Sequence, residues 1–65
     1  MKNEYILGED RIKILLFKSD NLSSLDFFIN DRLSMSIRHL DYDELVNNLD
    51  SHKEKFENFV NKNKQ

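Results

Sequence analysis

Several residue types are missing from this chain, and each absence excludes a kind of chemistry. Cysteine is absent, so the chain has no disulfide, no thiolate metal ligand and no thiol nucleophile. Proline is absent too, and the single glycine, Gly8, cannot supply a glycine-rich phosphate loop. The two histidines, His39 and His52, lie at no recognised spacing for a metal site or a catalytic pair. We therefore expect a protein that is not an enzyme and that uses no cofactor and no metal.

Long apolar runs and a strong charge of one sign are lacking as well. No stretch approaches the ~18 apolar residues of a membrane span, and the first residues lack the pattern of a signal peptide, so we expect a cytoplasmic protein without membrane contact. The net charge of -2 argues against a general polyanion binder. Alanine, threonine and tryptophan are missing while lysine, asparagine and isoleucine are frequent, a bias typical of AT-rich genomes such as those of low-GC bacteria and their phages.

The order of hydrophobic residues predicts one small α+β domain over residues 1–65. The apolar period is near two up to Arg38 and near 3.6 from Asp41 onward, which indicates strands followed by helix. The predicted strands cover residues 4–7, 11–18, 25–30 and 33–38, and they form an antiparallel meander of three to four strands. The helix covers residues 42–62 and packs on one face of the sheet. A chain of 65 residues seldom gains more than a few kcal/mol from its own core, so self-association or docking on another protein is expected to add stability.

The start of the helix is marked by capping signals. Asp41 and Glu44 have the spacing of a capping box, and Leu40 and Leu45 occupy the two positions of a hydrophobic staple. A second capping box, formed by Ser51 and Glu54, leaves open a break of the helix near Asp50.

The register of the second hairpin decides which residues share a face. A three-residue loop that pairs Ile29 with Leu33 places all the alternating apolar residues of residues 25–37 on one side, whereas a two-residue loop would set Phe28 opposite Leu33. We therefore expect the three-residue loop. The predicted core face then holds Ile12, Ile14, Leu16, Leu25, Phe27, Ile29, Leu33, Met35 and Ile37.

The opposite face of the predicted sheet mixes aromatic, aliphatic and charged residues, which is typical of an interaction site. The alternative is that Leu22, or Tyr5 and Leu7, folds over this face. The candidate partner-binding residues are Leu15, Phe17, Phe28, Arg11, Lys13 and Arg38.

The end of the helix offers a second candidate surface. A continuous helix over residues 42–62 would span ~30 Å and overhang a strand of ~20 Å. Either two copies pair through this overhang as a homodimer, or the helix breaks and folds back. The candidate self-association residues are His52, Phe56, Phe59 and Val60.

Two functions are consistent with these patterns. The first is a small protein-binding regulator or inhibitor, of the anti-host or anti-defence type that phages and mobile elements encode, which occupies a surface of a partner protein. The second is a nucleic-acid binder, in which Phe17 and Phe28 stack on bases while Arg11, Lys13 and Arg38 neutralise phosphates. Four strands followed by one helix, with "SIRHLDYDEL" over the last strand and the start of the helix, are also similar to the PC4-like domains. That resemblance implies a homodimer that binds single-stranded nucleic acid. The glycines and strongly basic segments of such domains are missing here.

Overall fold

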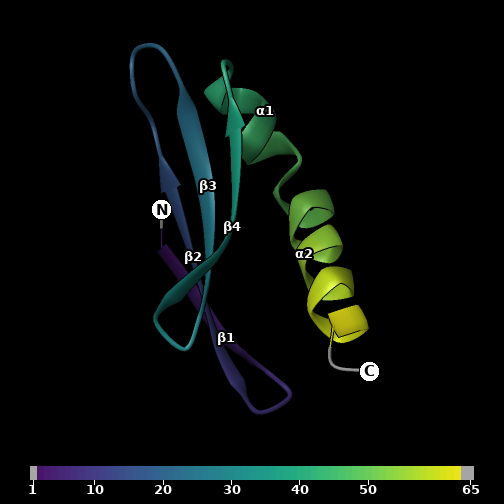
Figure 1. The fold of residues 1–65 in the computed structure, drawn as a ribbon. Coiled ribbons are helices and arrows are strands. Elements are labelled where there is room, and N and C mark those ends of the chain that lie inside the picture. The colour runs from purple at the N-terminus through teal and green to yellow at the C-terminus, as the bar shows by residue number, and fades with distance from the viewer. Residues whose placement is uncertain (1, 64–65) are drawn as a thin grey trace.

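The computed structural model describes residues 2–63 as one sheet layer and one helix layer (Figure 1). The strands are β1 (Lys2–Leu7), β2 (Asp10–Phe17), β3 (Ser23–Ile29) and β4 (Arg32–His39), and the helices are α1 (Tyr42–Asn47) and α2 (Leu49–Asn63). The strands form one antiparallel sheet in the order β1-β2-β3-β4, with both helices on the same side. The predicted α+β class, with a meander followed by C-terminal helix, is confirmed.

Alternation along the two central strands sets the buried face. In β2 the buried residues are Ile12, Ile14 and Leu16, and they lie opposite alternate residues of β3. Successive side chains of a strand point to opposite faces, so this one set is buried while the residues between them are not. The core cluster consists of Ile12, Ile14, Leu16, Leu25, Phe27, Leu45, Phe56 and Val60. Ile29, Met35 and Ile37, also expected in the core, are half-buried and pack against this cluster.

The hairpin between β3 and β4 differs from the prediction. Its loop has two residues, Asn30 and Asp31, and both have positive φ angles, 51° and 72°. Two-residue loops of this backbone type match the twist of a hairpin, and Asn and Asp tolerate the left-handed region better than most residues.

The predicted three-residue loop is therefore wrong, and a bulge explains why most of the register survives. Phe28 pairs with Leu33, the register then shifts by one residue, and Phe27 pairs with Met35 as expected. As a result, Leu33 lies beside Phe28 and is 59% exposed, instead of lying in the core.

The helical segment breaks at Asn48. The structure thus has the broken helix, one of the two possibilities that the sequence left open. Asn48 has φ -111° and ψ 21°, outside the helical region, and α2 begins at the next residue. The break comes before the Ser51 and Glu54 pair, so that pair lies inside α2 and does not cap it.

Asp41 caps α1, but neither of the two expected motifs is complete. The Asp41 carboxylate accepts the N–H of Asp43, while its own N–H donates to His39 Nδ1 at 2.9 Å and not to Glu44. Leu40 is 82% exposed and Leu45 fully buried, so the predicted hydrophobic staple does not form.

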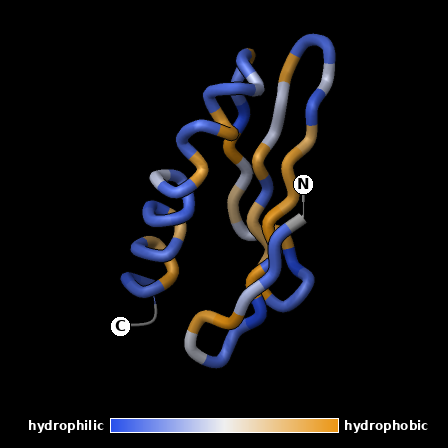
Figure 2. The backbone as a smooth tube through the Cα atoms, turned by 180° about the vertical axis from the view of Figure 1, so that it is seen from behind, coloured by the Kyte–Doolittle hydropathy of each residue, from blue (hydrophilic) through white to orange (hydrophobic). Residues whose placement is uncertain are grey.

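The break lets α2 lie back along the sheet, and this covers the aromatic residues of the tail. Phe56 stacks on Phe27 with ring centroids 4.5 Å apart, and Phe56 and Val60 are 0% and 5% exposed. In Figure 2 the hydrophobic positions of α2 lie on its side toward the sheet. Of the two alternatives for the tail, the structure of the single chain has the one in which the helix breaks and folds back to cover Phe56 and Val60. His52 is mostly buried as well, and of the four tail residues only Phe59 is exposed, at 45%.

Tyr5 connects the first strand to the last helix. Its hydroxyl donates to Glu57 Oε2 at 2.5 Å, and the Lys53 Nζ lies 4.3 Å from the centre of its ring. Burial, followed by the hydrogen bond to Glu57 and the negative charge of Glu57, raises the pKa of Tyr5 above its usual range.

This raised pKa predicts a loss of stability in alkali. The neutral phenol is favoured in the folded state, so its contribution is complete below the unfolded pKa of about 10 and declines as the pH rises above it. We expect the free energy of unfolding, measured by urea titration from pH 8 to 11, to fall with rising pH more steeply in the native protein than in Tyr5→Phe. Tyr42→Phe is the matched control and should keep the native slope. Equal slopes in all three proteins would contradict the role of the Tyr5 contact.

Candidate functional site

The face of the sheet opposite the helices is the candidate site, and it is called the bare face below. Strand pairing places alternate residues of all four strands on it, and both helices lie on the other side. The described side chains of the bare face are those of Glu4, Ile6, Arg11, Lys13, Leu15, Phe17, Ser24, Asp26, Phe28, Leu33, Ser36 and Arg38.

The structure places the six predicted partner-binding residues together on the bare face. Phe17 is 56% exposed, and Leu15 and Phe28 are half-buried by their neighbours in the sheet. Tyr5 and Leu7 pack against the core cluster on the helix side, so they do not cover the bare face.

Two exposed apolar residues of the bare face were missed by the sequence reasoning. Ile6 is 64% exposed and lies opposite Arg11, and Leu33 lies opposite Phe28. The signal for Ile6 was its alternation with Tyr5 and Leu7 in β1. Leu33 could not be placed without the length of the β3–β4 loop.

The cations at one end of the bare face are already paired within the chain. Asp31, in the β3–β4 turn, contacts Arg11 at 2.7 Å and Lys13 at 3.7 Å. The turn is held against β2 by Asn30, which accepts the Arg11 N–H at 2.9 Å. The hydrogen bond and the charge of Arg11, with a smaller effect of Lys13, hold the pKa of Asp31 below its usual range. Arg11 and Lys13 are therefore not a free pair of phosphate ligands.

A second polar group occupies the middle of the bare face. The Asp26 carboxylate accepts the hydroxyls of Ser24 and Ser36, each at 2.6 Å. This ties β3 to β4 and leaves a negative charge among the apolar side chains. Arg38 lies opposite Ser24 and is exposed.

A shallow hollow of about 240 Å³ lies beside Ile6, Arg11 and Lys13. Small-molecule sites usually enclose about 300–1,000 Å³, so this hollow suits one side chain of a partner better than a cofactor.

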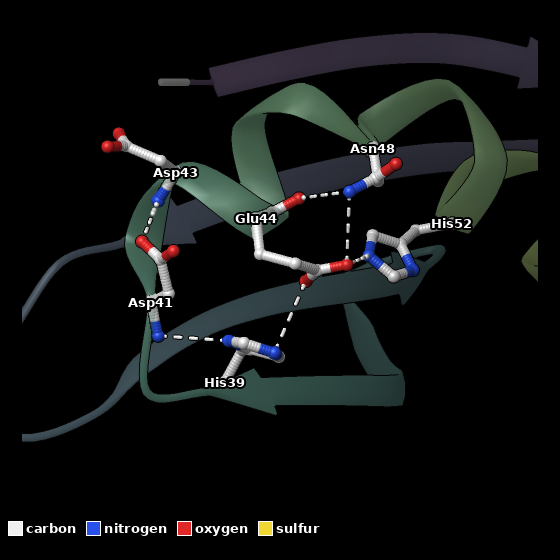
Figure 3. A network of polar contacts seen from close by, with 6 residues as sticks. All are labelled: His39, Asp41, Asp43, Glu44, Asn48 and His52. Atoms are coloured by element: carbon white, nitrogen blue, oxygen red, sulfur yellow. Dashed lines mark hydrogen bonds and ion pairs between the residues drawn. The ribbon is translucent and has the colours of Figure 1, made fainter.

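A separate polar cluster lies where β4, α1 and α2 meet (Figure 3). Glu44 Oε1 is 3.4 Å from His52 Nε2, and Glu44 Oε2 is 4.0 Å from His39 Nε2. Asn48 Nδ2 donates to the Glu44 backbone oxygen at 3.0 Å and to its Oε1 at 3.2 Å. The cluster thus joins the two helices across the break at Asn48.

The geometry of this cluster does not favour a metal centre. His39 Nδ1 accepts the Asp41 N–H, so the proton of the neutral ring lies on Nε2, the nitrogen that faces Glu44. That nitrogen cannot then act as a ligand beside Glu44. Within residues 2–63 no group of three histidine or carboxylate side chains has the arrangement of a metal site.

Comparison of the chain with protein-family models, with curated proteins and with solved structures finds no match. The resemblance to PC4-like domains therefore depends on the element order and on the short stretch of residues 36–45 alone. Neither α1 nor α2, nor any other helix within residues 2–63, has the length and apolar character needed to cross a membrane.

Proposed function

We propose that this protein is a small regulator or inhibitor that binds another protein through the bare face and acts by occupying the partner's surface. The observation that carries the proposal is the exposure of Ile6, Phe17 and Leu33 on a sheet face that the helices leave uncovered. Leu15 and Phe28 connect Phe17 to Leu33 across the bare face, whereas Ile6 lies apart from them opposite Arg11. Exposed apolar patches rimmed by polar residues usually mark interaction sites. We further propose that it acts in the cytoplasm of a bacterium or a phage-infected host, as its AT-rich composition suggests.

The electrostatics of the bare face favour a protein partner over single-stranded nucleic acid. Phosphate contacts supply most of the affinity for nucleic acids. Here Asp31 contacts both Arg11 and Lys13 and offsets one of their two positive charges, and Asp26 adds a negative charge between the aromatic residues. A nucleic acid would have to displace one carboxylate and approach another, whereas a protein can match both with its own polar groups.

The experiment that tests this function compares affinity capture by two folded variants. Ile6→Thr with Phe17→Thr removes apolar bulk from the bare face, and threonine keeps the preference for strand structure. We expect this double variant to recover the specific partner at least tenfold less than the native protein, as measured by quantitative mass spectrometry. The reason is that a few large side chains that the partner buries carry most of the affinity of an interface.

The matched control lies on the helix side. Val46 and Phe59 are 39% and 45% exposed, and Val46→Ser with Phe59→Ser should leave recovery unchanged. Circular dichroism is the measurement that checks whether both variants are folded. Equal recovery by all three proteins would show that the bare face is not the binding surface, and binding to an oligonucleotide that weakens steeply with salt would favour the nucleic-acid alternative.

The predicted homodimer stays a prediction. Phe56 and Val60 are buried within the chain, and of the four candidate self-association residues Phe59 is the exposed one. Light scattering at micromolar concentration measures the mass directly. A dimer that dissociates in the Ile6→Thr, Phe17→Thr variant would place self-association on the bare face.

A further inference from the structure

The free edge of β4 is a second surface, which borders the bare face and shares Ser36 and Arg38 with it. Within residues 2–63, β4 pairs only with β3, so every second residue of this eight-residue strand directs its backbone N–H and C=O groups away from the sheet. Proteins usually protect such an edge with proline, a bulge or a covering segment. The chain has no proline, and the bulge lies near the β3–β4 turn, which leaves Met35–His39 in regular pairing.

The side chains of β4 carry charge of one sign only. Arg32, Arg38 and His39 are its charged or ionisable residues, and the strand contains no acid. Unlike Arg11 and Lys13, Arg32 and Arg38 form no ion pair with another residue of the described chain, and both are exposed. The edge therefore presents two unneutralised arginines, one near each end of the strand.

The helix side of the same strand extends the core toward the edge. Met35 and Ile37 are half-buried, pack against the core cluster and lie opposite Phe27 and Leu25. An added strand with apolar residues at alternate positions would continue this layer. Ser36, on the bare face between them, is small and leaves the backbone accessible.

We propose that the β4 edge accepts an extended acidic segment of a partner protein as a fifth, antiparallel strand. Main-chain hydrogen bonds supply affinity in this kind of recognition, and the alternate side chains supply specificity. The segment carries an acidic residue opposite Arg38, apolar residues opposite Ile37 and Met35, a small polar residue opposite Ser36, and a second acidic residue near Arg32. The inference goes beyond the proposed function, since it names a second contact and the chemistry of the partner.

The charge of β4 argues against a second copy of this chain as the occupant. Antiparallel pairing of β4 with a second copy would bring four arginines and no acid to one pair of strands. Like charges gathered in this way repel each other. An acidic segment avoids this repulsion and neutralises both arginines.

The test uses a fluorescein-labelled peptide, Glu-Val-Thr-Val-Thr-Val-Glu, and fluorescence anisotropy with the full chain. We expect a peptide with lysine at both ends, and the Arg38→Glu variant with the original peptide, each to bind at least tenfold more weakly. Methylation of one alternate set of peptide amide nitrogens should abolish binding, while methylation of the other set should not. That difference is the signature of strand addition, because only one side of the peptide backbone faces β4.

Three outcomes would overturn the inference: equal binding of the acidic and basic peptides, equal effects of the two methylation patterns, or a dimer paired through β4 in the absence of peptide. The Ile6→Thr, Phe17→Thr variant separates the two proposals. It should keep peptide binding while losing partner capture through the bare face. Failure of peptide binding with capture intact would remove the β4 inference alone.

Discussion

Replacing Phe56 with alanine is expected to lower the free energy of unfolding by about 3–5 kcal/mol, the usual cost of truncating a buried phenylalanine. Phe56 is fully buried and stacks on Phe27, which is fully buried as well, so the substitution opens a cavity between the helix layer and the sheet. A domain of this size rarely has more than about 3–5 kcal/mol of stability in total. Phe56→Ala should therefore be largely unfolded at 25 °C in a urea titration followed by circular dichroism.

Phe59→Ala is the matched control for this experiment, because it is the same change three residues away in α2. Phe59 is 45% exposed, so we expect a loss below about 1 kcal/mol. If the baseline of Phe56→Ala cannot be measured, Phe56→Leu fills part of the cavity and should show an intermediate loss. Equal effects of alanine at both positions would mean that α2 does not fold back on the sheet.

Replacing Leu45 with alanine is expected to lower the free energy of unfolding by about 2–5 kcal/mol. Leu45 is the one fully buried residue of α1, and it belongs to the core cluster with Phe27 and Phe56. Its loss leaves a cavity where the first helix meets the sheet. Thermal unfolding by circular dichroism measures the change.

Leu40→Ala separates the observed packing from the hydrophobic staple. Leu40 is 82% exposed, so the structure predicts almost no change in stability, whereas a staple between Leu40 and Leu45 predicts a loss at both positions. A clear destabilisation by Leu40→Ala would favour the staple. The Leu40→Ala and Leu45→Ala variants can be compared directly because the same atoms are removed from the same residue type at both positions.

The bare face was predicted largely from the alternation of residues in β2 and β3. Leu15 and Phe17 lie on the same face of β2 as Arg11 and Lys13 because side chains alternate along a strand, and the register of β2 with β3 places Phe28 opposite Lys13. The state of those cations was not predicted, because Asp31 reaches them only after the two-residue turn folds back. The exposure of Leu33 was not predicted for the same reason. A loop of two residues instead of three changes which residue of β3 lies opposite Leu33.

Whether the C-terminal helical segment is continuous or broken also depends on contacts between residues far apart in the sequence. The apolar stripe through Leu45, Leu49, Phe56 and Val60 predicted which residues turn inward, and it fits both a continuous and a broken helix. Local signals placed the break near Asp50, whereas it lies at Asn48. Contact between Phe56 and Phe27, 29 positions apart in the sequence, requires the break, and no local pattern encodes such a contact.

Periodicity alone thus determined the class of fold, the order of its elements and the buried face of the two central strands, because each follows from the geometry of neighbouring residues. Tertiary structure decided the loop of the second hairpin, the burial of Phe56 and Val60, and the pairing of Arg11 and Lys13 with Asp31. These features depend on distances between residues far apart in the chain. Such distances exist only once the sheet has formed and the helices have packed against it.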